Sequence, residues 1–290
     1  MWAAARAGQC GIDLIKGFDN AEHKVKVAGE LKGFDITDHM DKMSARRTAR
    51  FTQLALVAAR EAFAQSGLDM SKENAARCGV NISSGIGGLP TIEEEHYKGI
   101  KRGFDKVSPL FVPMAISNMA AGTVAIEFGF KGSCTCVVTA CASGTNAIGE
   151  AFRQIRDGYA DVFLTGGSES CISELGIGGF TSMKALSESQ DPKRASIPFD
   201  RERNGFVMGE GAGVLLLESY DHAVARGAEI LCEIAGYGVS CDANHMTAPL
   251  EDGSGAAACM SSALEDAGVS ADQVGYCLLY TSQPGRCDFG

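Results

Sequence analysis

Apolar residues recur along the chain with two alternating periods, one typical of helices and one typical of short strands. Residues 50–65 place apolar side chains on one helical face, and Gly67 supplies a C-terminal stop. An apolar run that starts at Cys78 enters a glycine-rich loop, which predicts a short strand followed by a turn. Residues 118–128 are small and apolar, which predicts a tightly packed helix or one that contacts a partner.

The middle of the chain repeats strand, helix and strand with short connections. The run CTCVVTA, which begins at Cys134, predicts a strand that breaks into a helix. Apolar residues of that helix recur as far as Ile155, and Gly158 ends it. A second strand, DVFLTGG, follows at once. This order is the βαβ arrangement of a mainly parallel sheet covered by helices.

The same alternation continues toward the C-terminus. It predicts a strand over residues 213–218, a short helix over 221–226, a strand over 230–237 and a final helix over 255–267. Proline is scarce, and no linker or low-complexity segment interrupts the pattern. We therefore predict a compact α/β body.

Composition narrows the class of protein. The hydrophobic share of 45% and the charged share of 21% are ordinary for a globular enzyme. The longest apolar runs, such as residues 214–217, are too short to cross a bilayer, and the N-terminus lacks a secretory signal. A net charge of −10 argues against nucleic acid as a partner. We expect a soluble protein that binds no membrane and works in the cytoplasm, or in a plastid or mitochondrial matrix.

The chain has eleven cysteines, which could form disulfides, bind metal or carry thiol chemistry. No C-x-x-C motif occurs, and we predict no metal site. An odd number of cysteines without a signal peptide also disfavours a disulfide framework. Most of these thiols are therefore predicted to be small buried hydrophobic side chains.

Cys141 differs from the other cysteines because it lies where a predicted strand turns sharply into a helix. Free amides and the positive dipole end of a helix favour a thiolate there, and they can also stabilise an oxyanion. Its small neighbours, from Ala140 to Gly144, would let a substrate approach the sulfur. A buried structural cysteine is the alternative, and the residues alone leave both interpretations open.

A cysteine nucleophile usually works with a histidine. His245 lies in a loop close to Thr247, where it could line a site or form local hydrogen bonds. The other four histidines have polar surroundings, which predicts a solvated surface position for His23, His39, His96 and His222. From the residues alone, Cys141 has no obvious partner.

Several long motifs occur in a fixed order and resemble the β-ketoacyl-[acyl-carrier-protein] synthase family, most of all synthase II. The resemblance covers residues from about Gly8 to Tyr276. Its motifs are SSGIGGL, SPLFVPMAISNMAAG, VVTACASGTNAIGEAFRQIRDGYADVFLTGGSES, GIGGFTSMKALS, PFDRERNGFVMGEGAGVLLLE and HMTAP.

This resemblance implies a thiolase-like fold, which is an αβαβα layered sandwich of mixed, largely parallel sheets, commonly found as a homodimer. It assigns residues 1–229 to the half with the nucleophile, residues 230–276 to the start of an incomplete second half, and residues 277–290 to an aberrant tail. Cys141 matches the family nucleophile, which accepts an acyl group from acyl-carrier protein. The acyl group is then attacked by the carbanion that forms when malonyl-carrier protein loses CO₂. No metal or redox cofactor is implied, because the substrates are carried on phosphopantetheine.

The resemblance also assigns binding roles. Ile86 and Phe180 match the acyl pocket and its gate, and Thr247 matches the wall of the pantetheine channel. Acyl-carrier protein is acidic, so a local basic surface could steer it to an acidic enzyme. The residues assigned to this docking surface are Lys42, Arg46, Arg47, Lys106 and Lys184, with Arg50 beside the first three. An ordinary solvated helix start is the alternative for this cluster.

The sequence departs from the family at both ends. The opening strand of the family is absent, and Tyr280 stands where the family has its first catalytic histidine. The family's second histidine and its lysine would lie beyond residue 290. We therefore expect a chain truncated at both ends that does not complete the condensation. The alternatives are a non-catalytic dimer partner of the chain-length-factor type, which retention of Cys141 disfavours, and a polyketide ketosynthase, which the TACASG context disfavours.

Overall fold

The structure is a computed structural model that describes residues 2–276. Its centre is a four-stranded sheet in the order β4-β3-β5-β6. The strands are β3 (Cys78–Ser83), β4 (Cys134–Thr135), β5 (Val162–Glu169) and β6 (Gly211–Glu218). β3 runs parallel to β4 and β5, whereas β6 runs antiparallel to β5.

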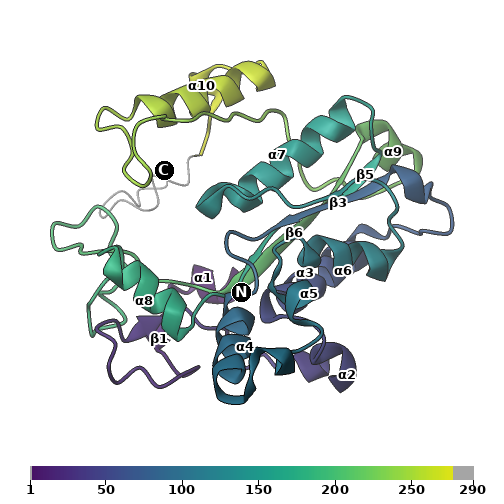
Figure 1. Ribbon diagram of the computed structural model, residues 1–290. Helices are drawn as coiled ribbons and strands as arrows, with labels where there is room; N and C mark the ends of the chain where they lie inside the picture. The colour runs from purple at the N-terminus through teal and green to yellow at the C-terminus, as the bar shows by residue number, and fades with distance from the viewer. Residues whose placement is uncertain (1, 277–290) are drawn as a thin grey trace.

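Helices cover both faces of this sheet (Figure 1). α3 (Arg50–Ser66) and α6 (Met119–Phe128) lie on one face, and α7 (Ser143–Arg156) lies on the other. Phe163 and Leu164 are neighbours in β5 and point to opposite faces, as alternate residues of a strand must. Leu164 joins the core under α3 and α6, and Phe163 joins the core under α7. A strand buried on both faces explains why Val162, Phe163 and Leu164 are apolar without alternation.

The other elements surround this α/β/α body. In chain order they are α1 (Trp2–Arg6), β1 (Asp13–Leu14), β2 (Val27–Ala28), η1 (Ile36–Asp38), α2 (Lys42–Ala45), η2 (Ala75–Arg77), α4 (Leu89–Arg102), η3 (Phe104–Lys106), α5 (Phe111–Ala115), η4 (Ala140–Ala142), α8 (Glu174–Ser182), α9 (Tyr220–Ala225), α10 (Ser254–Ala267) and η5 (Ala271–Gln273). β1 and β2 pair as a separate antiparallel ribbon. The predicted tail, residues 277–290, lies outside the described residues.

Most of the helices and strands predicted from the sequence are confirmed. α3 ends at Gly67, whose φ of +64° is the left-handed conformation that a glycine C-cap adopts at low cost. The predicted helix over 255–267 is present as α10, and the predicted strand over 213–218 is present as β6.

The strand predicted from CTCVVTA is wrong in its length, because pairing stops after Thr135. Beyond that point side-chain oxygens replace the neighbouring strand as hydrogen-bond acceptors. The N–H of Val137 donates to Ser83 Oγ at 3.0 Å, and the N–H of Thr139 donates to Ser143 Oγ at 2.9 Å. The chain therefore leaves the sheet early and bends toward Cys141.

The strand predicted over residues 230–237 is also wrong. Within the described part of the chain, residues 229–243 form no backbone-to-backbone hydrogen bond, so no ladder exists there. The segment instead runs extended between α7 and α10 (Figure 1). Gly236 and Gly238 face α10 so closely that a Cβ on either would overlap its backbone. An extended backbone alone does not make a strand, which also needs a paired neighbour.

Among residues 2–276, no helix is both long and apolar enough to cross a membrane. In the same part of the chain, no group of three or more His, Cys, Asp or Glu side chains is arranged to hold a metal ion.

Candidate active site

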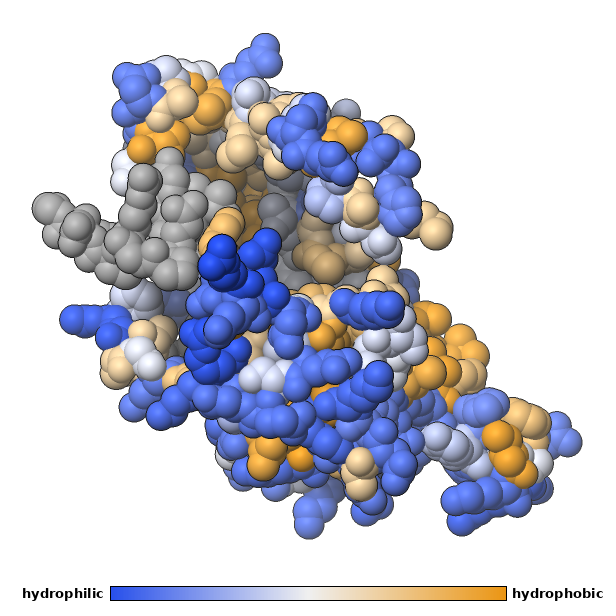
Figure 2. Space-filling view, turned by 90° about the vertical axis from the view of Figure 1, so that its left-hand side faces the viewer, coloured by the Kyte–Doolittle hydropathy of each residue, from blue (hydrophilic) through white to orange (hydrophobic). Residues whose placement is uncertain are grey.

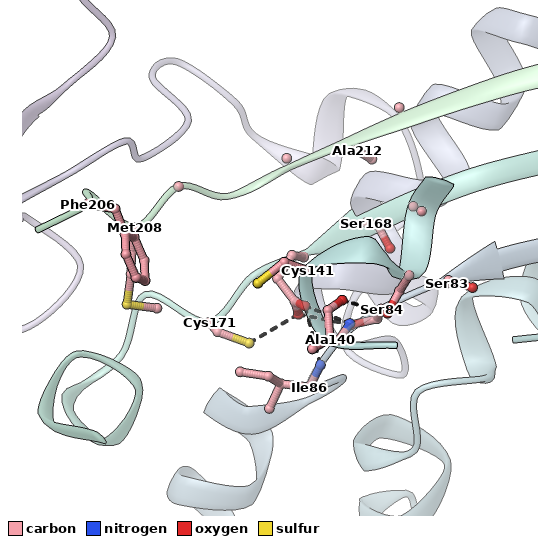
Figure 3. Close-up of a pocket in the computed structure, with 18 of the residues that line it drawn as sticks. Ser83, Ser84, Ile86, Ala140, Cys141, Ser168, Cys171, Phe206, Met208 and Ala212 are labelled. Carbon is pink, nitrogen blue, oxygen red and sulfur yellow. Dashed lines mark hydrogen bonds between the residues drawn. The ribbon is translucent and has the colours of Figure 1, made fainter. Parts of the chain in front are cut away.

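A pocket of about 480 Å³ opens at the carboxyl ends of β3 and β5. Its walls come from the loop after β3, the turn before α7, the end of β5, α8 and the segment that leads into β6. Ligand sites in α/β proteins favour this edge of the sheet, because the loops that follow the strands converge there. Figure 3 shows Cys141, Ile86, Cys171 and Met208 around this pocket.

Cys141 lies in η4, directly before α7, and its side chain is exposed. The turn that carries it is closed by Ser143, whose hydroxyl donates to the carbonyl oxygen of Ala140 at 2.6 Å. Ala140 has a φ of +51°, a left-handed conformation that is costly for a residue with a Cβ. The backbone is thus held in a tight turn that presents the sulfur to the pocket.

The thiol stands at the N-terminal end of a helix of 14 residues. The first N–H groups of α7 have no partner inside the helix, and the helix dipole makes this end positive. Both effects stabilise negative charge that develops close to the Cys141 sulfur, such as that of an oxyanion. These are the electrostatic requirements for attack on a thioester carbonyl.

Two other thiols near the sheet are poor nucleophiles. Cys171 also lines the pocket but is buried, and burial together with the Glu169 carboxylate strongly raises its pKa. Burial raises the pKa of Cys78, inside the core, to about 11. Exposure and location in the pocket wall therefore distinguish Cys141 from these two thiols.

Two of the predicted substrate-binding residues join Cys141 in the pocket. Ile86 follows β3 and Phe180 lies in α8, and both line the same cavity. Phe180 packs edge-to-face against Phe206, with ring centroids 5.6 Å apart. Thr247 lies in an exposed loop and does not line this pocket, so its assignment to a pantetheine channel remains a prediction.

No histidine lines the pocket in the described structure. His245 Nδ1 accepts hydrogen bonds from the N–H groups of Thr247 and Ala248, both at 3.1 Å, which agrees with the local role that was one of the two alternatives. The surface position predicted for His222 is wrong. Its ring is partly buried between the carboxylates of Glu218 and Glu73, on the side of the sheet remote from the pocket.

The five cations assigned to carrier docking are exposed and form no salt bridge within residues 2–276; they are Lys42, Arg46, Arg47, Lys106 and Lys184. Figure 1 shows α2, α4 and α8, which carry or adjoin these residues, in the lower half of the molecule. Arg50 differs, because its guanidinium is bound to the buried carboxylate of Glu210 through two contacts of 2.7 Å. Arg50 is therefore a structural residue and is not free to dock a partner.

The pocket residues that were not identified from the sequence include Glu169, Cys171, Phe206 and Met208. A signal for Glu169 was its position two residues beyond the predicted strand DVFLTGG, since ligand sites favour the carboxyl ends of such strands. No local signal marked Phe206 or Met208, which reach the pocket only because their segment pairs with distant parts of the chain.

Comparisons with known proteins agree with this geometry. Residues 1–223 match the family described as "Beta-ketoacyl synthase, N-terminal domain", and residues 231–279 match "Beta-ketoacyl synthase, C-terminal domain". The 3-oxoacyl-[acyl-carrier-protein] synthase 2 of Staphylococcus aureus is 50% identical over 275 residues, covering 95% of this chain and 68% of the relative. The synthase 2 of Vibrio cholerae is 48% identical over 276 residues, covering 95% and 67%. The boundary predicted between residues 229 and 230 falls between the two matches and remains a prediction.

Solved structures show the same fold. The ishigamide ketosynthase/chain length factor superposes with a TM-score of 0.85 at 31% identity, over 94% of this chain and 66% of that chain. A type II polyketide ketosynthase in complex with its acyl-carrier protein (AntDE:AntF) gives a TM-score of 0.84 at 33% identity, over 95% and 67%. A β-ketoacyl synthase from Burkholderia phymatum gives 0.82 at 32% identity, over 95% and 67%. The chain spans about two thirds of the length of these relatives, and the predicted thiolase-like α/β fold is confirmed. The chain therefore belongs to the β-ketoacyl synthase family.

Proposed function

We propose that the protein is a β-ketoacyl-acyl-carrier-protein synthase of fatty-acid elongation, an acyltransferase in which Cys141 holds the growing acyl chain. The observation that carries the proposal is an exposed thiol on a tight turn, in front of the N-terminus of α7 and inside a pocket of about 480 Å³. The 50% identity to a 3-oxoacyl-[acyl-carrier-protein] synthase 2 supports elongation of fatty acids as the reaction.

The described residues supply the first half of this reaction. The Cys141 thiolate attacks the thioester carbonyl of an acyl-phosphopantetheine, and the tetrahedral oxyanion forms close to the first N–H groups of α7. Collapse of this intermediate expels the pantetheine thiolate, which takes up a proton, and leaves the acyl group on Cys141. Neither a metal nor a redox cofactor takes part in this exchange. In the second half of the reaction, the carbanion from malonyl-carrier protein attacks the acyl group and yields a β-ketoacyl product. We propose this step as part of the complete family reaction and assign it to none of the described residues.

The acyl-transfer step can be tested directly. The purified 290-residue chain is incubated with acyl-carrier protein that bears a labelled acyl thioester, and the label is located by peptide mass spectrometry. We expect one acyl group on Cys141 and none on Cys141→Ala. The control, Cys232→Ala, removes an exposed thiol outside the pocket and should acylate like the parent. Label that persists on Cys141→Ala would refute the proposal.

We also propose acyl-carrier protein as the partner. The AntDE:AntF structure contains a ketosynthase bound to its acyl-carrier protein, and the five unpaired cations offer an acidic partner local attraction despite the net charge of −10. Arg46→Glu and Arg47→Glu should therefore slow acylation from the carrier protein but not from a free pantetheine thioester. Lys131→Glu changes an exposed cation next to β4 by the same amount and is the matched control.

A homodimer through the edge of the sheet is proposed as the assembly. β4 pairs with β3 on one side, and no strand within residues 2–276 covers its other side. Exposed Ile126 of α6 lies on the helix packed next to this edge. Unpaired edges are sites of strand association between chains. Ile126→Lys should shift the chain from dimer to monomer in light scattering, whereas a parent that is already monomeric would contradict the proposal.

A polyketide ketosynthase is the second candidate, because solved ketosynthases of that class share the fold. Their identity to this chain is 31% and 33%, against 50% for the fatty-acid synthase 2. Cys141 also argues against the third candidate, a non-catalytic partner, since such a partner has no use for an exposed thiol in an open pocket.

A further inference from the structure

The loop after β3 is fastened to the end of β5 by a single carboxylate, that of Glu169. Its Oε1 accepts from the Ser84 hydroxyl at 2.9 Å and from the Cys171 thiol at 3.1 Å. Its Oε2 accepts from the N–H of Gly85 at 2.8 Å and from the N–H of Ile86 at 3.3 Å. Ile86 is thus anchored through its backbone while its side chain faces the pocket.

The same loop touches the turn that carries Cys141. A Cβ placed on Gly85 would lie 3.0 Å from Glu169 Oε2 and 3.2 Å from the carbonyl oxygen of Ala140. Gly85 is therefore enclosed between the carboxylate on one side and the residue before Cys141 on the other. Figure 3 shows Ser84, Ile86, Ala140 and Cys141 gathered on this side of the pocket.

A carboxylate suits this position better than any neutral group. All four partners are donors, and an ionised carboxylate is purely an acceptor with room for about four hydrogen bonds. No Lys, Arg or His nitrogen in the described chain lies within salt-bridge distance of Glu169. In the described chain the Glu169 carboxylate therefore binds only neutral donors of the pocket wall. Hydrogen bonds to a charged acceptor are stronger than hydrogen bonds between neutral groups.

Glu169 is held through its backbone at the end of a central strand of the sheet. It is the last residue of β5, which pairs with β3 on one side and with β6 on the other, where Glu169 is the register partner of Gly211. The Glu169 side chain thus fixes the loop after β3 relative to the central strand β5. Gly85 of that loop in turn contacts Ala140 in the turn that carries Cys141. The turn needs such a contact because Ala140 is held in a costly left-handed conformation. Without the contact, the turn would relax out of that conformation.

We infer that Glu169 is a positioning residue that holds the acyl-pocket loop and the Cys141 turn in register. The inference rests on the proposed acyl transfer for its consequence in catalysis. Two effects follow: Ile86 keeps a fixed place in the wall that meets the acyl chain, and the Cys141 sulfur keeps a fixed place relative to the amides of α7. Displacements of about 1 Å at such a site are costly for the reaction.

Glu169→Gln in the full chain is the sharpest test. The variant keeps the size of the side chain but puts an amide N–H₂ against two donors on one side. We expect acylation of Cys141 by acyl-carrier protein to fall at least about tenfold, and the preference between a hexanoyl and a myristoyl donor to change at least about threefold. Amide hydrogen exchange at Gly85 and Ile86 should accelerate at least about tenfold, because the neutral amide oxygen that still faces their N–H groups is a weaker acceptor than the ionised carboxylate.

The matched control is Glu95→Gln. Glu95 is buried and accepts a hydrogen bond from the N–H of Ser108 at 2.6 Å, but it lies outside the pocket. This variant should change acylation less than about twofold and leave the chain-length preference unchanged. If Glu169→Gln does not fold, Ser84→Ala, which removes one of the four donors, should shift both readouts in the same direction by about threefold.

The outcomes separate this inference from the proposed function. If either acylation or exchange in Glu169→Gln stays within about twofold of the parent, the positioning role is overturned. If the parent itself accepts no acyl group, the proposed function fails. Exchange at Gly85 and Ile86 then decides the role of Glu169 by itself, since it needs no substrate.

Discussion

The ring of Tyr237 lies directly on Gly149 of α7, so that a Cβ on Gly149 would overlap three ring atoms. The guanidinium of Arg153 covers the same ring, with its central carbon 4.7 Å from the ring centroid. A glycine inside a helix is costly, and here the absence of a side chain lets the extended segment 229–243 approach α7.

Gly149→Ala should therefore destabilise the fold by about 1–3 kcal/mol, because the new methyl group has no room. Gly178→Ala is the matched control: Gly178 lies within α8, and a Cβ there meets nothing within 4 Å. That change should be neutral or stabilising by up to about 1 kcal/mol, through lower entropy of the unfolded chain. Urea unfolding of the two variants measures the difference, and equal midpoints would contradict the packing argument.

Ser143→Ala should loosen the turn that presents Cys141. The substitution removes the hydrogen bond to Ala140 O and leaves the N–H of Thr139 without its acceptor. Ser143 is buried, so the expected loss of unfolding free energy is about 1–3 kcal/mol. Acylation of Cys141 should fall at a temperature where the variant is still folded.

Thr145→Ala is the control for this change, because Thr145 is exposed and lies two residues further along α7. It should keep both stability and acylation. A Ser143→Ala variant that acylates as fast as Thr145→Ala would show that the turn does not depend on this hydroxyl.

The stability of the protein should decrease with pH around neutrality because of His222. Its Nδ1 lies 2.7 Å from Glu218 Oε1, and its Nε2 lies 2.8 Å from Glu73 Oε2. Burial disfavours the charged ring, but the two carboxylates outweigh burial and raise the pKa of His222 above its usual 6.5. The protonated ring is thus stabilised in the folded state. The stabilisation is complete below about pH 6.5 and is lost as the pH rises through the raised value.

Melting temperatures measured from about pH 5.5 to pH 9 test this linkage. The parent should melt at lower temperature as the pH rises, and His222→Gln should show a flatter profile over the same range. Arg226, which also binds Glu218 and stays charged throughout, does not contribute to the slope. A parent and variant with parallel profiles would exclude His222 as the cause.

The ion pair between Arg50 and Glu210 joins a buried carboxylate to a more exposed guanidinium, so loss of the guanidinium should be costly. The Glu210 side chain is only 7% exposed, while that of Arg50 is 38% exposed. Burial would raise the pKa of Glu210, but hydrogen bonds from Arg50 and from the N–H of Leu31 outweigh burial and lower it. Arg50→Met leaves the buried carboxylate without its cation and should cost about 2–4 kcal/mol, reduced from a fully buried pair by the exposure of Arg50.

The double variant Arg50→Met/Glu210→Gln should recover part of that loss, because the neutral amide can still accept from Leu31 and needs no cation. Denaturant unfolding of the two single variants and the double variant gives the coupling energy. Strictly additive effects would mean that the pair does not interact in solution.

The parts of the fold that the sequence predicted correctly are those whose cause is local. α3 and α7 carry their apolar faces and their terminal glycines within one segment, so period and composition suffice. The turn that places Cys141 before a helix could be predicted for the same reason, since its small residues and the helix follow one another directly, whereas the choice between a nucleophile and a buried cysteine stayed open from the residues alone. The prediction that residues 230–237 form a strand failed because pairing is not a property of one segment.

The contacts that could not be predicted from the sequence join residues far apart in the chain. Glu73 and His222 are 149 positions apart, so no residue near His222 in the sequence indicated a partner for its Nε2. Glu169 is 85 positions from Ser84, and its four donors come from two segments. A carboxylate at the end of a strand could be noticed, but its role depends on which loop the sheet brings to it.

The placement of α10 has a consequence for how the molecule comes apart. α10 is joined to α7 mainly through segment 229–243 and through Asp266, which accepts from Tyr237 N at 2.9 Å and from Arg156 at 2.8 Å. All residues that line the pocket lie between Ser83 and Gly213. We therefore expect heating or limited proteolysis to detach the α10 region as a separate cooperative unit while the surroundings of Cys141 stay assembled.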